Sequence, residues 1–177
     1  MANPETNKQV ILKYLEAKGF PDNAIPAIMA NIEVETGGTF DYKTKQRGGS
    51  AKGLFQFDPK GGKYQDYKSY LGDYKDNMFQ QIDYFYDTIL GDRQHVIGTK
   101  NARKLQQSFE NDDPRTIAEN LTNIWFRPGK PHLEKRLNAV DNYIPQQPQT
   151  QPQGSMVSNN EMFGTIDYLR NLFNFGK

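Results

Sequence analysis

One segment near the N-terminus constrains the fold of this chain more than any other: residues 25–38, with the sequence IPAIMANIEVETGG. Its apolar side chains recur at i, i+3, i+4 and i+7, which places them on one face of a helix: Ile25, Ile28, Met29 and Ile32. Asp22 is the expected N-cap, and Pro26 is tolerated in a first turn. Gly37 and Gly38 stop the helix, one of them as a left-handed C-cap. The segment therefore predicts a helix with a buried face that ends at a glycine pair.

Glu35 lies at the border of that buried face, in the last turn of the predicted helix. A carboxylate there meets the negative end of the helix dipole, and partial burial also disfavours its charge. Both effects raise the pKa of a carboxyl group, as a general acid that works near neutral pH requires. The alternative is a surface glutamate beside a cap, and the helix taken alone favours that alternative. Glu33 lies toward the other border of the face and is expected to be solvated.

A second segment, Gly53-Leu54-Phe55-Gln56-Phe57-Asp58, favours Glu35 as a general acid over Glu35 as a surface residue. It is an apolar, strand-like run that carries one amide and then one acid. Together the two segments predict a carboxylic acid in a partly dry cleft, facing a wall that can hold a polar ligand. This is the arrangement that protonates a glycosidic oxygen.

The two segments resemble the lysozyme-like superfamily, most closely phage tail lysozyme domains, and also goose-type lysozymes and lytic transglycosylases. In that superfamily a helix ends in a catalytic glutamate followed by a small hydroxyl residue and glycine, as in Glu35-Thr36-Gly37. A short β-segment then begins Gly-Leu and continues with an aromatic residue or Met, Gln and an apolar residue, as in residues 53–57. Goose-type members place an aspartate directly after this run, the position of Asp58. The resemblance covers roughly residues 7 to 144, and residues 60–76 depart from the pattern.

The resemblance implies an enzyme that cleaves the β-1,4 bond between N-acetylmuramic acid and N-acetylglucosamine, with Glu35 as general acid. After Glu35 protonates the leaving oxygen, the reaction could finish in two ways, and both stay open. In the favoured one, Asp58 positions or activates water, as in a muramidase. In the other, the substrate's own C6 hydroxyl closes a 1,6-anhydro ring, as in a lytic transglycosylase. Asp41 competes with Asp58 for the role of second acid. The residues expected to contact substrate are Gln56, Gly53, Phe55 and Asp41.

The pattern of the whole chain predicts an α+β fold that is mainly helical, with a small antiparallel sheet beside the cleft. The catalytic domain spans residues 1–144. The further helices expected in it are residues 7–18, 78–90, a segment from Asp113-Pro114 to Trp125, and one from Leu133 to Ile144. Trp125 is expected to anchor the core rather than to form a platform for sugar. His95 and His132 stand apart from other ligand-type residues, so no metal site and no cofactor are expected.

Residues 145–160 predict an extended Pro/Gln-rich linker, and residues 161–177 an amphipathic helix. That helix cannot bury its apolar face alone. It is expected to dock on its own domain, on another copy of the chain or on a virion protein. A membrane surface ranks lower, because Arg170 and Lys177 are too few basic charges for an anchor.

The charge of the chain limits the classes of partner that it can bind, and its cysteine content limits how the fold is stabilised. The 177 residues include 22 basic and 21 acidic ones, a net charge of +1, so no strong general attraction to nucleic acid or membrane is expected. Residues 43–47 form a locally basic strip, which suits either the anionic groups of a cell wall or a solvated loop. Cysteine is absent, so no disulfide braces the fold.

No signal peptide and no transmembrane run is apparent in the sequence, so an extracellular substrate requires another route of delivery. A phage virion component satisfies this requirement. So does an endolysin held in the host cytoplasm before its release to the periplasm. The rival from another class is a non-enzymatic glycan-binding virion part. The presence of both Glu35 and Asp58 argues against that rival.

Overall fold

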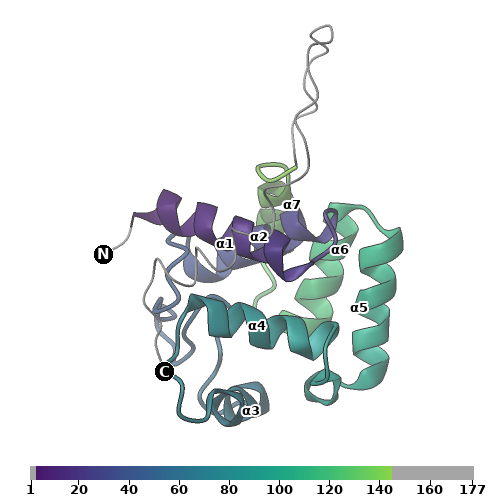
Figure 1. Cartoon of the computed structure of the whole chain (residues 1–177). Coiled ribbons are helices and arrows are strands. Elements are labelled where there is room, and N and C mark those ends of the chain that lie inside the picture. The colour runs from purple at the N-terminus through teal and green to yellow at the C-terminus, as the bar shows by residue number, and fades with distance from the viewer. Residues whose placement is uncertain (1–2, 145–177) are drawn as a thin grey trace, which may run out of the picture. The chain divides into compact units, whose positions relative to one another are not determined.

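The computed structural model describes residues 3–144, and Figure 1 shows the arrangement of their helices. Helix α2 (Ala24–Thr36) is buried along most of its length. Every residue of α2 is buried except Glu33, Val34 and Glu35. The predicted apolar face is therefore only part of the buried surface, because neighbouring helices cover α2 on several sides. Glu35 lies at the boundary of the buried region, as its spacing predicted.

The predicted end of α2 is confirmed, but its predicted N-cap is wrong. Gly37 adopts the left-handed conformation, with φ of 60°, which glycine reaches without steric penalty. The amide of Gly38 then donates to the carbonyl of Glu33 at 2.8 Å. At the other end, Asn23 rather than Asp22 precedes the helix, and it makes no side-chain cap hydrogen bond.

The described residues form six further α-helices. They are α1 (Pro4–Lys18), α3 (Gly62–Leu71), α4 (Met78–Ile89), α5 (Thr99–Asn111), α6 (Pro114–Leu121) and α7 (Leu133–Val140). A 3-10 turn, η1 (Gln94–Val96), precedes α5, and a π-helical turn, η2 (Thr122–Phe126), follows α6. The expected helices in residues 7–18 and 78–90 are confirmed, whereas α7 ends at Val140 and does not continue to Ile144.

The start of α6 follows from local chemistry. Asp113 is its N-cap, and Oδ1 of that residue accepts hydrogen bonds from the amides of Arg115 and Thr116 at 2.9 and 3.2 Å. Pro114 occupies the first helical position, where no amide proton is needed. The Asp113-Pro114 pair therefore begins a helix, as predicted from the sequence.

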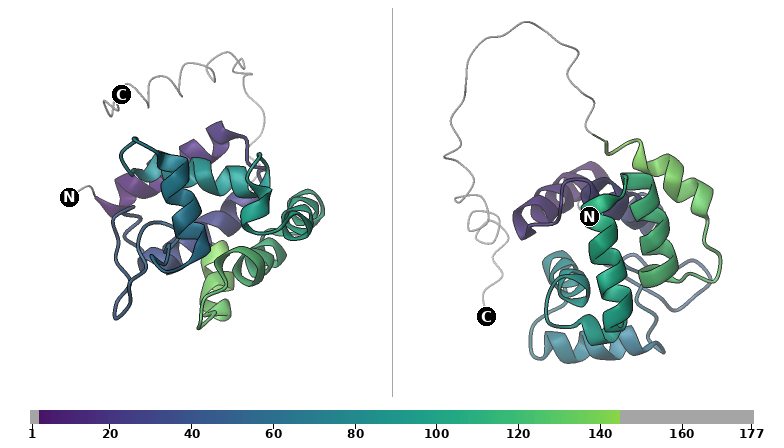
Figure 2. Two further views of the ribbon diagram at one scale, coloured as in Figure 1. Left: turned by 90° about the horizontal axis from the view of Figure 1, so that it is seen from below. Right: turned by 90° about the vertical axis from the view of Figure 1, so that its right-hand side faces the viewer.

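Helix α2 packs chiefly against α6 and α7, and α1 packs against α4. Helix α5 lies beside α6, and Figure 2 shows this arrangement from two further sides. Two helices from the C-terminal part of the described chain thus enclose the helix that carries Glu35. The predicted linker and amphipathic helix of residues 145–177 lie outside the described residues.

An aromatic cluster fills the core between the loop of residues 53–57, α4 and η2. The rings of Phe55 and Phe85 stack with centroids 4.6 Å apart, and Trp125 meets Phe85 edge-on at 4.9 Å. The indole Nε1 of Trp125 donates to Oγ1 of Thr88 at 2.9 Å, so its one polar atom is satisfied within the core. Trp125 is therefore a core anchor, as expected.

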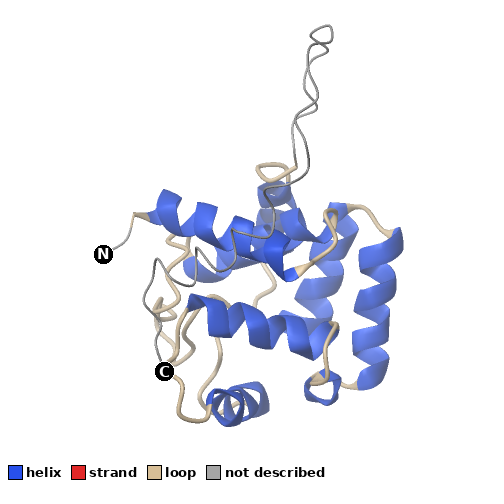
Figure 3. Cartoon of the chain, viewed as in Figure 1, coloured by secondary structure: helices blue, strands red, loops and turns tan. Residues whose placement is uncertain are grey.

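The predicted antiparallel sheet is wrong for the described residues, which contain no β-strand (Figure 3). Two isolated bridges are all that remain of it, Lys45 with Lys52 and Lys52 with Phe57. Positive φ angles at Gly53 (92°) and Gln56 (46°) turn the chain back before an extended ladder can form. The run that looked like a strand is a set of tight turns between single bridging residues.

Candidate active site

Glu35 occupies the last turn of α2 with its side chain 13% exposed. One carboxylate oxygen, Oε1, accepts a hydrogen bond from Nη2 of Arg136 at 2.6 Å. The other oxygen, Oε2, accepts no hydrogen bond from the residues that the structure describes. Glu35 therefore has one oxygen fixed by a cation and one available to a ligand.

Arg136 comes from α7, and its side chain is only 2% exposed. Besides Glu35, it donates from Nη1 to Oδ1 of Asn31 at 2.6 Å and from Nε to the carbonyl of Pro131 at 2.8 Å. Its guanidinium also lies 5.4 Å from the centroid of the Phe126 ring. A buried arginine with partners in three directions has a fixed position, so it holds the Glu35 carboxylate in place.

Asn31 extends this network into the core. It is fully buried in α2, and its Nδ2 donates to the carbonyl of Ala27 at 2.9 Å. Its Oδ1 accepts from Oγ1 of Thr122 at 3.1 Å as well as from Arg136. The Glu35 carboxylate is thereby connected through Arg136 and Asn31 to α7 and η2.

Thr36, the small hydroxyl residue after Glu35, shapes the chain where α2 ends. Its Oγ1 donates to the carbonyl of Ile32 at 2.8 Å and accepts from the amide of Phe40 at 3.2 Å. Thr36 is 3% exposed, so it does not offer its hydroxyl to a ligand. Its role is to fix the turn that follows the candidate acid.

Lys63, in the first turn of α3, is a cation whose charge interacts with that of Glu35. Its Nζ donates to the carbonyl of Trp125 and lies 4.2 Å from the centroid of the Trp125 ring. Burial, together with the positive charge of Arg127, lowers the pKa of Lys63 to about 8, while the negative charge of Glu35 acts in the opposite direction. Lys63 therefore lies within electrostatic range of both Arg127 and the candidate acid.

The Gly-Leu pair of the second segment is held by a side chain of α4. The amide of Leu54 donates to Oε1 of Gln81 at 2.8 Å. Gly53 has φ of 92°, and a Cβ atom there would lie 2.6 Å from the same Gln81 oxygen. Nε2 of Gln81 in turn donates to the carbonyl of Tyr42 at 3.1 Å. Glycine at position 53 is therefore favoured by its positive φ, and a side chain there would also displace the Gln81 amide from Leu54. Its expected contact with substrate stays a prediction.

Gln56 points its amide back into the same loop. Its Nε2 donates to the carbonyls of Thr44 and Gly53, at 3.3 and 2.9 Å. Its Oε1 is buried and has no hydrogen-bond partner among the described residues. The amide nitrogen braces the loop, and the buried oxygen is an acceptor that the described residues leave without a partner.

Phe55, predicted to contact substrate, is 3% exposed and packs in the aromatic cluster. It has little surface left for a sugar, because Phe85 and Trp125 cover its ring. The structure therefore gives Phe55 a packing role. Phe55 therefore anchors the loop of residues 53–57 to the aromatic core.

The two candidate second acids lie on loops outside the Glu35 network. Asp58 is exposed, and its Oδ1 accepts from Oγ of Ser50 at 3.2 Å and from the amide of Lys60 at 3.0 Å. Oδ1 of Asp41 accepts from the amide of Lys43 at 2.9 Å. Within the described residues, neither carboxylate shares a hydrogen bond or ion pair with Glu35 or Arg136. The structure therefore brings together Glu35, Arg136 and Asn31, and it adds neither aspartate to that network.

Arg136 was not among the residues singled out from the sequence, although the sequence contains a signal for it. It follows Leu133 by one turn and precedes Val140 by one turn, so it lies within an apolar helical stripe. A basic residue in such a stripe requires an anionic partner when the helix is buried. The sequence does not indicate which of the chain's acidic residues that partner is.

The described residues contain no group of three or more His, Asp or Glu side chains arranged to hold a metal ion. Within residues 3–144, no helix combines the length and the apolar character that crossing a bilayer requires.

The family model for phage tail lysozymes matches residues 6–145. The chain belongs to the phage tail lysozyme family. Membership assigns it a phage-associated, lysozyme-like function with peptidoglycan as the substrate class. Glu35 and Arg136 both lie within the matched range. Neither the comparison with curated proteins nor the comparison with solved structures gave a match.

Proposed function

We propose that this phage tail lysozyme cleaves the β-1,4 bond between N-acetylmuramic acid and N-acetylglucosamine, with Glu35 as the general acid. The observation that carries the proposal is the asymmetry of the Glu35 carboxylate. Oε1 is fixed by Arg136 at 2.6 Å, and Oε2 is left without a hydrogen-bond partner among the described residues. A carboxyl group held by one oxygen presents the other in a defined direction.

This asymmetry suits proton donation. A protonated carboxyl group has one hydroxyl donor and keeps a carbonyl oxygen that can still accept. Glu35 can therefore give a proton from Oε2 to the glycosidic oxygen while Oε1 keeps its bond to Arg136. After the transfer, the negative charge forms next to a buried guanidinium that is already in position. The sugar ring gains oxocarbenium character as the bond to the leaving oxygen breaks.

Asp58 is the proposed second acid, in the role of positioning or activating the attacking water. Its exposed loop position leaves it accessible to solvent, which suits a group that recruits water. The second route, closure of a 1,6-anhydro ring by the substrate, is favoured by one observation. Glu35 is the only carboxylate that the described residues place in the Arg136 network, and that route needs a single glutamate.

Loss of turbidity of purified cell walls tests the proposal. We expect the wild-type chain to clear the walls, and we expect Glu35→Gln to reduce the rate by about 10²–10⁴-fold, because the proton donor is lost. Glutamine keeps an oxygen that can accept from Arg136, but it leaves the buried guanidinium without a negative partner, so the assay is run at a temperature where circular dichroism shows the variant folded. Glu119→Gln is the matched control, since Glu119 is an exposed glutamate on α6.

Activity of Glu35→Gln within a few-fold of wild type would exclude Glu35 as the acid. A wild-type chain that binds walls without clearing them would support the non-enzymatic alternative. We further propose that the protein is carried in the virion for local penetration of the cell wall. Detection of the chain in purified phage particles tests that placement, and its restriction to lysates of infected cells would favour an endolysin.

A further inference from the structure

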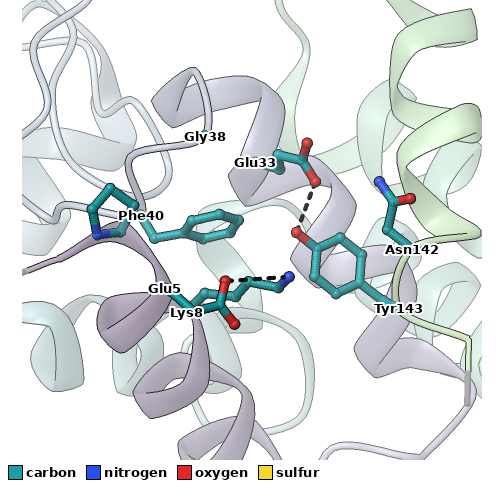
Figure 4. A pocket seen from close by; sticks show the side chains of 8 residues that line it. Glu5, Lys8, Glu33, Gly38, Phe40, Asn142 and Tyr143 are labelled. Carbon is teal, nitrogen blue, oxygen red and sulfur yellow. Dashed lines mark hydrogen bonds and ion pairs between the residues drawn. The ribbon is translucent and has the colours of Figure 1, made fainter.

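A hollow of about 350 Å³ lies between the start of α1, the end of α2 and the turn that follows α7 (Figure 4). Its lining includes two carboxylates, one ammonium, one amide and two aromatic rings: Glu5, Glu33, Lys8, Asn142, Phe40 and Tyr143. Small-molecule sites begin at roughly 300 Å³, so the volume suits one or two small building blocks of a polymer. No role is assigned to it by the mechanism at Glu35.

The hollow is separate from the candidate acid because of helix geometry. Residues two positions apart on an α-helix point about 200° apart around its axis. Glu35 accordingly meets Arg136 of α7, whereas Glu33 meets the hydroxyl of Tyr143, which donates to its Oε2 at 2.7 Å. Glu33, which the sequence predicted to be merely solvated, therefore has a partner and lines a cavity of its own.

The polar groups of the hollow keep unused hydrogen-bonding capacity. Within the described residues, Oε1 of Glu33 accepts no hydrogen bond and the side-chain amide of Asn142 makes none. Lys8 is only loosely engaged, with its Nζ 3.8 Å from Oε2 of Glu5 and 5.2 Å from the centroid of the Tyr143 ring. An ammonium has three donors and a carboxylate about four acceptor positions, so both can bind further groups.

The charges favour a ligand that carries both an amine and a carboxylate. Two carboxylates can receive an ammonium, while Lys8 and Asn142 can donate to a carboxylate. A sugar is less well matched, because sugars pack on open aromatic faces. Phe40 is 4% exposed and Lys8 lies over the Tyr143 ring. Phe40 therefore has almost no open surface for a sugar, and Lys8 occupies one face of Tyr143.

We propose that this hollow binds the peptide stem of peptidoglycan, with a stem amine at Glu33 and Glu5 and a stem carboxylate at Lys8 and Asn142. The inference rests on the proposed function, since it takes its ligand from the same polymer. It names a different part of that polymer, because the glycosidic bond belongs to the sugar strand and the hollow recognises the attached peptide. Binding there would favour peptide-bearing strands over bare glycan.

Isothermal titration of the full chain with a synthetic, sugar-free stem tetrapeptide tests this, with its N-terminus acetylated and its side-chain amine left free. Glu33→Gln and Lys8→Met should each weaken peptide binding about tenfold or more, because a hydrogen bond to a charged group is lost. Glu119→Gln and Lys104→Met, both exposed in α6 and α5, should bind the peptide as wild type does. Glutamine at 33 can still accept from Tyr143, and thermal melts would verify the fold of each variant.

A peptide that does not bind the wild-type chain, or that binds both hollow variants with unchanged affinity, overturns the proposal. A parallel titration with an N-acetylglucosamine oligomer separates the two ligand classes. If Glu33→Gln and Lys8→Met weaken sugar binding instead, the hollow belongs to the glycan and the peptide assignment fails. Because the peptide contains no glycosidic bond, this outcome does not depend on cleavage. Wall clearing by the wild-type chain tests the proposed function on its own.

Discussion

Nη2 of Arg136 lies 2.6 Å from Oε1 of Glu35, although 101 positions separate the two residues in the chain. Their side chains are 2% and 13% exposed. Removing one partner of a buried ion pair leaves an uncompensated charge, and this is far more costly than the net contribution of the pair. The contact therefore links the placement of the candidate acid to the stability of the whole domain.

Arg136→Met should destabilise the protein by about 3–5 kcal/mol, because Glu35 and Asn31 both lose a buried donor. Arg136→Lys should be milder, since it keeps the charge but cannot span Asn31, Glu35 and Pro131 at once. Urea unfolding measures both. The same two variants should lose wall-clearing activity at temperatures where circular dichroism shows them folded. Two variants as stable and as active as wild type would contradict the positioning role.

Asp58→Asn distinguishes the two ways of completing the reaction. If Asp58 handles water, this variant should lose most of the hydrolysis while keeping the fold, because Asp58 is an exposed loop residue. The masses of the released muropeptides provide the readout. Products lighter by one water than the hydrolysed form, released by an active Asp58→Asn chain, would establish the anhydro route and remove Asp58 from the mechanism.

Lys63 should make stability depend on pH in the alkaline range. Its pKa falls from 10.5 to about 8 in the folded chain, so between these values the unfolded chain binds more protons. Stability should then rise with pH through this window, by at most about 1.4 kcal/mol per unit.

The comparison is best made between pH 8 and 10. Above that range, the raised pKa values of buried tyrosines such as Tyr67 and Tyr84 lower stability, because only the unfolded chain releases their protons. Urea unfolding of Lys63→Met should lack the rise seen in wild type. Parallel pH curves for the two proteins would show that Lys63 is not the responsible group.

Gly53→Ala should destabilise the loop that carries Gln56 and Asp58. Its φ of 92° is unfavourable for alanine, and the added Cβ would lie 2.6 Å from Oε1 of Gln81. We expect a loss of about 1–3 kcal/mol by urea unfolding. Gly62→Ala is the matched control, because a Cβ atom there meets nothing within 4 Å and its φ is ordinary. Equal stability of the two variants would mean that the loop relaxes freely around position 53.

The features that sequence predicted correctly are those decided by neighbouring residues. The end of α2 depends on Gly37, and the start of α6 depends on Asp113 and Pro114, within one turn of the element concerned. The border position of Glu35 follows in the same way from helical spacing. Each of these needs no knowledge of the rest of the chain.

The features that sequence missed depend on distant partners or on unusual backbone. No local pattern assigns Arg136 to Glu35, because the two come together only when α7 packs on α2. The predicted sheet failed because Gln56, a non-glycine residue, adopts a φ of 46°. That conformation is stabilised by its own side-chain bonds to Thr44 and Gly53, which composition does not reveal.

The separation of 101 residues between Glu35 and Arg136 also has a consequence for synthesis. At about 5–20 residues per second, a ribosome adds Arg136 roughly 5–20 s after Glu35. During that interval the nascent chain contains the acid, its helix and the glycine turn, but not the arginine that orients them. The site is therefore completed only when almost the whole domain has been translated. A chain that terminates before Arg136 should be inactive as well as unstable.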